Sequence, residues 1–394
     1  MLGSGMKVAT LAQRTYASVD SFTLMAIPFF MLAGKLMEVG GMSKRIVRLA
    51  DCLVGWMAGG LAHVIVVASA FFGALSGSAA ATTAAIGSTL IPEMKKRGYP
   101  ADFVAGIQAV AGALGVIIPP SITMIMYGVC SSTSIGKLFM AGIVPGIVLA
   151  LFLMVTIAYQ AKKRKISQMN TFTFKELGTA FLDAIPALLV PTIILGGIYG
   201  GIFTPTEAGA VAATYGFLAG AFWYKEINLQ NIGNIMGGAI VNTVLVMIVV
   251  GASGAFSWLL TSAGVSSLLG KAISAIAGNK YIFLLVANLI FIFIGMFIES
   301  VAGILIVTPI LLPIATSLGV DPVHFGIIMV VNLALGLTTP PVGENQYIAA
   351  AIAEIPFEEE VKASIPFLIA GFAALAVITY VEPLSLWLPG ILGM

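Results

Sequence analysis

Residues 113–121 read ALGVIIPPS, and residues 334–342 read ALGLTTPPV. The two stretches belong to one longer repeat, because Pro92 upstream of the first matches Pro313 upstream of the second at the same offset. Each copy ends an apolar segment with two prolines, which remove backbone donors and disfavour helix in the preceding residue. The repeat therefore predicts two broken helices in corresponding places, which in a membrane protein indicate a transport site.

The composition places the chain in a membrane. Its 394 residues are 59% hydrophobic and only 9% charged, whereas a soluble domain has about 25% charged residues. The net charge of +2 does not indicate a nucleic-acid surface. Cys52 and Cys130 form neither a disulfide framework nor a metal-ligand spacing. We expect an all-α polytopic membrane protein and no enzyme.

Charge-free stretches locate the membrane segments of the first half. Residues 52–92 contain no charged side chain and are about twice as long as the ~20 residues of one membrane helix. The small polar residues SGSAAATTAA in the middle of this stretch predict a turn at membrane depth. We therefore expect a re-entrant hairpin over residues 61–94 that turns at 76–79, followed by a broken helix over 103–129.

The second half repeats this order. A hairpin over residues 281–317 is expected to turn near Glu299 and Ser300, and a broken helix follows over 323–353. A last span is expected over 364–388. Outside the spans, two stretches mix polar and apolar residues and are either helices on the membrane surface or connecting loops: residues 42–55 and 227–237.

The positive charges give the two halves opposite orientations. Lys44 and Arg45 precede the first hairpin and Lys95 follows it, so its open end is expected in the cytoplasm. The second hairpin opens at the loop 319–322, which lacks Lys and Arg and is expected outside. Opposite orientation of similar sequence predicts inverted repeats. We expect one membrane domain, 1–394, with repeats at 21–161 and 204–388 joined by 162–203.

Oxygen atoms collect where each hairpin turn would meet a break. The first break frees carbonyls near Gly115 and adds the hydroxyls of Ser121 and Thr123, which suit a hard cation. Helix N-termini at the breaks also favour an anion. The alternative is a plain proline kink whose serines bond to their own helix. The other oxygen-bearing positions are Ser76, Gly77, Ser78, Glu299, Ser300, Thr338, Thr339 and Gly343.

Four further polar residues need a separate interpretation. Glu207 in TPTE is predicted to be either a helix cap or a transport residue, with Thr204 and Pro205 as the helix start. Glu344 after the second break either supports the site or faces a vestibule. His63 and His324 have no metal-ligand partners in the sequence and are expected to pack. No Lys or Arg in the apolar segments is an obvious ligand for a carboxylate.

Several motifs in the chain resemble the large membrane subunit of tripartite ATP-independent periplasmic (TRAP) transporters. The matching stretches cover nearly the whole chain in the family's order. They are AIPFFMLAGKLMEVGG (26–41), GALSGSAAATTAAIG (73–87), MKKRGYPADF (94–103), GVIIPPSITMIMYGV (115–129), SIGKLFMAGIVPG (134–146), GIFTPTEAGAVAATYG (201–216) and TPILLP…GLTTPPVG (308–343).

The resemblance implies a sodium-driven importer of a small organic acid in the bacterial inner membrane. A soluble periplasmic protein would deliver the acid, and a small four-helix membrane subunit would brace the chain. The hairpins and broken helices would move as an elevator, with sodium ions and no other cofactor. One sodium would lie among Ser76, Gly77, Ser78, Gly115, Pro119 and Ser121, and another among Glu299, Ser300, Thr338, Thr339 and Gly343. The residues implied for the solute are Ser78, Thr82, Thr123, Ser300 and Pro341.

Two other functions compete with this prediction. A sodium/carboxylate symporter that works without a binding protein would share the whole architecture. An intramembrane serine hydrolase would use Ser76 as nucleophile with His63 or His324 as base, but it would leave the Pro-Pro repeat unexplained. The family usually has one more apolar span before residues 12–22, so a missing first span is also expected.

Overall fold

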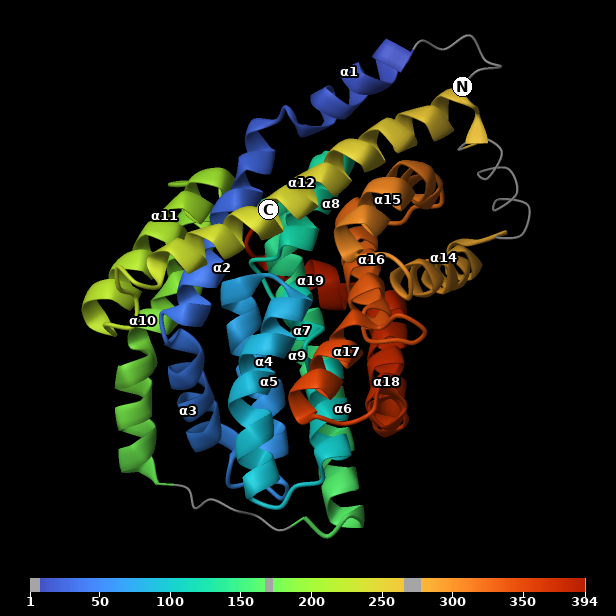
Figure 1. Cartoon of the computed structure of the whole chain (residues 1–394). Helices are drawn as coiled ribbons and strands as arrows, with labels where there is room; N and C mark the ends of the chain where they lie inside the picture. The colour runs from blue at the N-terminus through green and yellow to red at the C-terminus, as the bar shows by residue number, and fades with distance from the viewer. Residues whose placement is uncertain (1–7, 167–172, 266–277, 394) are drawn as a thin grey trace.

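The structure is a computed structural model that describes residues 8–166, 173–265 and 278–393, and every regular element within these residues is a helix (Figure 1). The helices up to the middle of the chain are α1 (Val8–Val19), η1 (Phe22–Met25), α2 (Ala26–Val39), α3 (Met42–Val54), α4 (Gly60–Ser76), α5 (Ala79–Lys96), α6 (Ala101–Ala111), α7 (Leu114–Ile117), α8 (Ile122–Ser131) and α9 (Ile135–Lys163). The later ones are α10 (Phe174–Tyr199), α11 (Pro205–Leu218), η2 (Ala219–Trp223), α12 (Ile232–Ser262), α14 (Lys280–Gly295), α15 (Ser300–Ser317), α16 (Pro322–Gly336), α17 (Glu344–Ala353), α18 (Phe357–Tyr380) and α19 (Pro383–Ile391).

These helices fit a membrane. Among the described residues, 6 helices are long and apolar enough to cross a bilayer, or up to 7 when the bent pair α6–α7 and α8 is included. Only helices satisfy every backbone group within one lipid-exposed segment. The predicted all-α polytopic class is confirmed.

Both re-entrant hairpins form where they were predicted. Helices α4 and α5 make the first, and α14 and α15 make the second. The first turn needs only two residues, because Gly77 adopts a left-handed φ of 62° and Ser78 caps α5. In the second turn, Glu299 caps α15. Each hairpin therefore ends in a capped helix start that points into the protein.

Both predicted breaks are present as well. Helix α7 ends at Ile118, which is extended (φ −83°, ψ 126°), and α8 starts after the cis Pro119–Pro120 bond with a bend of 44°. In the second half, α16 ends before the cis Pro340–Pro341 bond, and α17 starts after Gly343 at a left-handed φ of 53°. The extended backbone at Ile118 is what a following proline favours.

Contacts at one end of the molecule fix the direction of the first hairpin. Arg164 at the end of α9 pairs with Asp102 at the start of α6 at 3.1 Å. Lys95 at the end of α5 donates to the carbonyl of Ala353 at the end of α17 at 2.7 Å. The open end of the first hairpin therefore lies beside the start of the first broken helix and the end of the second, at the bottom of Figure 1.

Contacts at the other end fix the direction of the second hairpin. Lys280 at the start of α14 pairs with Glu382 at 2.7 Å and approaches the carbonyl of Gly319. The hydroxyl of Tyr127 near the end of α8 donates to the carbonyl of Pro322 at the start of α16 at 2.6 Å. The two hairpins therefore open at opposite ends of the molecule, which is the inverted arrangement that the charge pattern predicts.

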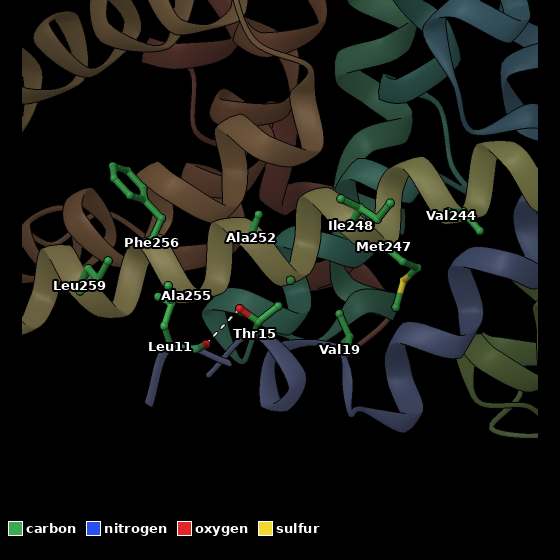
Figure 2. A pocket seen from close by; sticks show the side chains of 11 residues that line it. Leu11, Thr15, Val19, Val244, Met247, Ile248, Ala252, Ala255, Phe256 and Leu259 are labelled. Carbon is green, nitrogen blue, oxygen red and sulfur yellow. Dashed lines mark hydrogen bonds between the residues drawn. The ribbon is translucent and has the colours of Figure 1, made fainter. Parts of the chain in front are cut away.

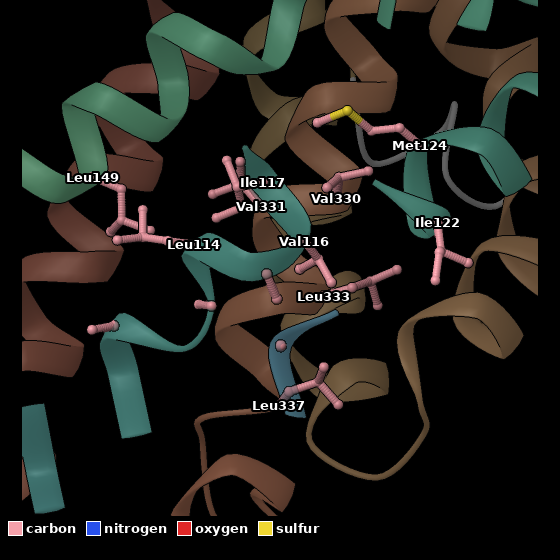
Figure 3. Close-up of a cluster of buried hydrophobic side chains, with 14 of the residues drawn as sticks. Leu114, Val116, Ile117, Ile122, Met124, Leu149, Val330, Val331, Leu333 and Leu337 are labelled. Atoms are coloured by element: carbon pink, nitrogen blue, oxygen red, sulfur yellow. The ribbon is translucent and has the colours of Figure 1, made fainter. Parts of the chain in front are cut away.

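The two broken helices share one apolar core. Ile117 of α7 lies beside Val331 of α16, and Leu114 of α7 lies beside Leu149 of α9 (Figure 3). All four side chains are fully buried. This packing brings the break in the first repeat and the break in the second repeat together near the middle of the protein.

One of the open alternatives is decided and two predicted boundaries change in the structure. Residues 42–55 form a helix, α3, that buries Ile46 and Leu49, so they are not a plain connecting loop. Residues 227–237 are instead a loop and the first turns of α12, which begins at Ile232. The expected span 364–388 is two helices, because α18 ends at Tyr380 and α19 starts at Pro383. Parts of 1–394, 162–203 and 204–388 lie outside the described residues.

Candidate functional site

A cavity of about 390 Å³ lies where the two hairpin turns and the two breaks meet. Its walls come from both repeats and from two helices outside the hairpins, α2 and α12. The polar and charged lining residues are Lys35, Glu38, Ser76, Ser78, Thr123, Asn242, Glu299 and Glu344. A concave site of this size with a few convergent polar groups suits a small solute.

The first hairpin turn contacts the first break directly. The backbone N–H of Ile122 donates to the carbonyl of Gly77 at 3.4 Å. A methyl group at Gly77 would lie 2.9 Å from the carbonyl oxygen of Pro120. A methyl group at Gly115 would collide with the carbonyl oxygen of Ser78. Only glycine at these positions lets the turn and the break approach so closely.

Neutral oxygen atoms line this contact. The hydroxyls of Ser76 and Thr82 lie 2.9 Å apart. The Ser78 hydroxyl accepts a hydrogen bond from the N–H of Ala81 at 3.4 Å, and the buried Ser121 hydroxyl accepts one from Met124 at 3.3 Å. These oxygens cap helices and still have lone pairs for a cation. The serines therefore cap helices, as the proline-kink interpretation expects. They also supply the oxygen ligands that the ion-site hypothesis requires.

The second hairpin turn carries a charge at the corresponding place. The carboxylate of Glu299 accepts a hydrogen bond from the N–H of Val301 at 2.7 Å and faces the cavity. The hydroxyl of Ser300 is buried and has no hydrogen-bond partner within the described part of the chain. A buried hydroxyl without a partner is uncommon. The Ser300 hydroxyl therefore has unused hydrogen-bonding capacity behind this turn, although the side chain is fully buried.

The second break supplies two hydroxyls that bond to their own helix. Thr338 and Thr339 both donate to the carbonyl of Leu335 at 2.7 Å. Their oxygens remain available as acceptors. Downstream, the N–H of Asn345 donates a hydrogen bond to the carbonyl of Leu337 at 3.1 Å, which links the two sides of the break.

A pair of glycines joins hairpin and break in each half. A methyl group at Gly73 would lie 2.9 Å from the Cα of Gly115, and one at Gly295 would lie 3.0 Å from the Cα of Gly336. The sequence pattern indicates a site role for Gly115 but for neither Gly73 nor Gly295. Close backbone approach through small residues is how membrane helices pack tightly. These contacts attach each hairpin to its own broken helix.

The structure divides the predicted site residues by whether they line the cavity. Those that line it are Ser76, Gly77, Ser78, Thr123, Glu299 and Glu344. Those outside its lining are Gly115, Pro119, Ser121, Thr82, Ser300, Thr338, Thr339, Pro341, Gly343 and Glu207. Of the predicted solute contacts, Thr82 and Ser300 are fully buried, whereas Pro341 is exposed but does not line the cavity.

Glu207 is a helix cap. Its carboxylate accepts hydrogen bonds from the N–H and the hydroxyl of Thr204 at 2.8 Å, and its own N–H donates back to that hydroxyl at 3.2 Å. This reciprocal arrangement is a capping box with Pro205 at the first helical position. The predicted cap is therefore confirmed.

Lys35, Glu38 and Asn242 were missed by the sequence analysis. The ammonium of Lys35 lies 3.1 and 3.0 Å from the two carboxylate oxygens of Glu38. Gly34 packs against the backbone of Ser76, where an added methyl would sit 3.4 Å away. This contact puts a basic residue, Lys35, beside the first hairpin turn, with its ammonium paired to Glu38.

The residues of the hydrolase alternative do not form a catalytic pair. The Ser76 hydroxyl bonds to Thr82, while His324 Nε2 lies 3.2 Å from the carbonyl of Thr379. Both ring nitrogens of His63 lack partners within the described residues. Nucleophilic catalysis requires a base within hydrogen-bond reach of the nucleophile. The histidines pack inside the protein, as expected.

A second hollow lies away from this site, between α1 and α12 (Figure 2). It is an open groove of about 700 Å³ and is lined mostly by apolar side chains, among them Leu11, Met247 and Phe256. The Thr15 hydroxyl beside it donates to the carbonyl of Leu11 in its own helix at 3.0 Å. Among the described residues, its lining includes no charged side chain and no residue of either hairpin.

The inverted hairpins and breaks around a polar cavity define a polytopic membrane transporter. Over residues 1–384 the sequence matches the family described as "Tripartite ATP-independent periplasmic transporter, DctM component". The chain belongs to this family and is a large permease component of a TRAP transporter.

Relatives with assigned names transport different solutes. The chain is 41% identical to the C4-dicarboxylate large permease protein DctM of Pseudomonas aeruginosa, covering 100% of this chain and 92% of that one. It is 37% identical to the sialic acid permease SiaM of Vibrio cholerae, covering 96% and 88%. It is 44% identical to the isethionate permease DctMQ of Oleidesulfovibrio alaskensis, covering 96% of this chain and 60% of that one.

A solved structure shares the fold. The YdaH transporter of Alcanivorax borkumensis, whose report describes an unusual topology, superposes with a TM-score of 0.68 over 97% of this chain and 88% of that one. At 14% sequence identity this likeness concerns the fold alone. It agrees with the all-helical architecture described above.

Proposed function

We propose that the chain imports a small organic acid together with sodium ions, as the membrane-spanning path of a three-part transporter. The observation that carries the proposal is the cavity between the two hairpin turns, where capped helix starts and oxygen-bearing breaks converge. Paired broken helices near the membrane midplane are the usual framework of substrate and ion sites in secondary transporters.

One sodium ion would be held where the first turn meets the first break. The proposed ligands are hydroxyl and carbonyl oxygens of Ser76, Gly77, Ser78, Gly115 and Ser121. The direct contact between Gly77 and Ile122 keeps these oxygens within one small volume. The structure supports the proposal through the density of oxygen atoms at the contact, because carbonyl and hydroxyl oxygens replace the hydration shell of a hard cation.

A second sodium ion would be held at the second turn and break. Glu299, Ser300, Thr338, Thr339 and Gly343 are the proposed ligands. The carboxylate of Glu299 is anchored by the N–H of Val301, and the Ser300 hydroxyl has no other partner within the described residues. A carboxylate near a desolvated cation strengthens binding because their attraction is weakly screened there.

The organic acid would occupy the cavity between the turns. The first N–H groups of α5, at Ala79 and Ala80, line the cavity and have no carbonyl partner within their own helix. Such helix starts bind carboxylates. Lys35 would add a positive charge from α2, outside the hairpins.

Transport would occur when the hairpins and broken helices move together past α2, α11 and α12. The glycine contacts described above attach each hairpin to its break, so the ions and the acid would travel with them. Lys35 and Asn242 belong to the helices that stay behind, and they would meet the acid at only one end of the movement. We place the chain in the bacterial inner membrane, with a small membrane subunit and a periplasmic binding protein as partners.

Uptake by proteoliposomes tests this function. The chain is reconstituted with its small subunit and binding protein, and uptake of organic acids is followed with sodium outside, sodium on both sides or potassium only. The proposal expects uptake only with an inward sodium gradient. Uptake that continues at the same rate without sodium would contradict it, and equal uptake without the binding protein would favour a stand-alone symporter.

A further inference from the structure

One unused oxygen atom lies against the second break. Gln346 is the third residue of α17, and its side chain is fully buried. Its amide oxygen, Oε1, has no hydrogen-bond partner among the residues that the structure describes. Such atoms are uncommon in protein interiors, because an acceptor buried without a donor loses its hydration and gains nothing in return. The ligands proposed above leave this oxygen without a role.

The oxygen lies beside Gly343, which is one of the proposed ligands of the second ion. A methyl group at Gly343 would lie 2.7 Å from Oε1 of Gln346 and 3.3 Å from the carbonyl oxygen of Thr339. No described backbone N–H donates to that carbonyl. The Thr339 hydroxyl already gives its hydrogen to the carbonyl of Leu335. Oxygens with unused lone pairs therefore meet at Gly343, and such a set suits a hard cation.

The other end of the same amide group is fixed by α18. Nε2 of Gln346 donates to the hydroxyl of Ser364 at 3.0 Å, and this hydroxyl donates in turn to the carbonyl of Val361 at 2.9 Å. Ser364 is fully buried. Because the amide group is planar, the hydrogen bond at Nε2 also sets the direction of Oε1. A serine of α18 thus turns an oxygen of α17 toward the break.

A helix cap is the ordinary role of a glutamine at this position. In a capping box, the third helical residue accepts a hydrogen bond from the backbone N–H of the residue before the helix. Thr204 and Glu207 form a complete box of this kind, with Thr204 at a φ of −69° and a bond of 2.8 Å. Gly343 has a left-handed φ of 53° instead, and Oε1 of Gln346 accepts no hydrogen bond from it. Gln346 is therefore free to bind something else.

The lack of a partner does not by itself make a ligand. Gln108 in α6 is also fully buried, and neither of its amide atoms has a partner within the described residues. Its Cγ packs against Gly87, at 3.2 Å from an added methyl group. Along α5, Gly87 is about 13 Å from Ser78 at the first turn. Because its atoms are not among those closest to Gly343, Gln108 provides a control.

We propose that Gln346 binds the second sodium ion through Oε1, beside the carbonyl oxygen of Thr339, and that Ser364 positions the amide group. The inference rests on the proposed function and adds a ligand that the repeat does not contain, because the position matching Gln346 in the first half is Ile125. A neutral amide oxygen leaves Glu299 as the single charged ligand. A low ligand charge suits a monovalent cation better than a divalent one.

Equilibrium sodium binding to the purified chain tests the role of the oxygen. Gln346→Leu removes it at similar volume, and the second ion should bind at least about tenfold more weakly. Gln346→Glu keeps an oxygen at the same reach and should bind this ion at least as tightly as the unaltered protein. Gln108→Leu, the same substitution at the control position, should leave both ions unchanged. Unchanged affinity in Gln346→Leu, or equal weakening in any two of these variants, would overturn the inference.

A double substitution tests the role of Ser364. Ser364→Ala leaves Nε2 of Gln346 without its acceptor and should weaken the second ion severalfold. Because Ser364 acts through the amide group, Ser364→Ala should cause no further loss in a chain that already carries Gln346→Leu. A loss of the same size in both backgrounds would show that Ser364 acts independently of Gln346 and would overturn its positioning role.

The same binding curves separate this inference from the proposed function. When Gln346→Leu is combined with Glu299→Gln, the first ion should keep its normal affinity. If both ions weaken in that double variant, Gln346 does not belong to the second site and the inference is overturned. If the unaltered chain binds no sodium, the proposed function fails as well. Two ions with unchanged affinity in Gln346→Leu would remove only the present inference.

Discussion

The first hairpin turn presents only hydroxyl and backbone oxygens to the cavity, whereas the second hairpin and its break present the carboxylates of Glu299 and Glu344. The backbone plan of the two halves is nevertheless the same. Each has a hairpin, a break with a cis Pro-Pro bond and a glycine contact that joins them. The repeat therefore duplicates the backbone arrangement of hairpin and break, but only the second half adds carboxylates to the cavity.

This difference teaches how each half would hold an ion. A neutral oxygen site depends on how closely the turn approaches the break, because each dipole contributes little unless several converge. A site with a carboxylate depends more on charge and tolerates small displacements. Variants that change spacing should therefore damage the first site most, and variants that remove charge should affect the second.

The largest effect is expected when a methyl group is added to a glycine at which a hairpin contacts its broken helix. Gly115→Ala would push a methyl group into the carbonyl of Ser78, and Gly336→Ala would place one 2.5 Å from the Cα of Gly295. Overpacking of this kind costs about 1–3 kcal/mol. Sodium-driven uptake should be lost in both variants. Gly178→Ala, which has no atom within 4 Å of the added methyl, is the control and should keep normal uptake.

The second largest effect, a loss of sodium affinity, is expected when the charge of the second hairpin turn is removed. Glu299→Gln keeps an acceptor for the N–H of Val301 but loses the charge, so the sodium concentration for half-maximal uptake should rise about tenfold. Asp321→Asn is the matched control, because Asp321 caps α16 through Val323 at the same distance of 2.7 Å but lies outside the cavity. Equal sodium curves for both variants would argue against an ion at the second turn.

Loss of a serine hydroxyl tests the first break. Ser121→Ala removes a cap that should be worth about 1 kcal/mol to stability, and it should also weaken sodium binding severalfold. Ser134→Ala removes a similar cap, at the exposed start of α9. The two variants should lose similar stability in thermal unfolding, and a rise in the sodium requirement should occur only for Ser121→Ala. If both keep the normal requirement, Ser121 is only a cap.

The smallest effect is expected at Glu207. Glu207→Ala breaks the capping box with Thr204 and should cost about 1 kcal/mol. Because the side chain does not line the cavity, the sodium and acid concentrations for half-maximal uptake should stay unchanged. A changed sodium requirement would show that Glu207 takes part in transport after all.

The sequence predicts the hairpins and breaks well because their signals are local. Proline pairs, charge-free stretches and a polar SGS turn need no knowledge of the rest of the fold. Even the boundary at Pro383, where a single span was expected over 364–388, had a local signal that was overlooked. Helix α19 starts at that proline.

The rest of the site depends on tertiary packing. Lys35 and Glu38 lie in α2, far in the sequence from both Pro-Pro motifs, and reach the cavity only because Gly34 packs against Ser76. Gly73 and Gly295 are two of 44 glycines, and nothing in the sequence distinguishes their close contacts from the others. The depth of Thr82 and Ser300 behind the cavity surface likewise follows from the helix rotations that packing imposes.

Equilibrium binding of radioactive sodium to the purified chain tests the central claim most directly, because it counts ions without requiring the solute. We predict two sodium ions per chain in the unaltered protein. In Ser121→Ala one ion should bind severalfold more weakly, in Glu299→Gln the other ion should bind about tenfold more weakly, and the remaining ion should keep its affinity in each case. Both ions should bind more weakly when the changes are combined. A single ion in the unaltered protein, or unchanged affinity for both ions in all three variants, would contradict the assignment of one ion to each half.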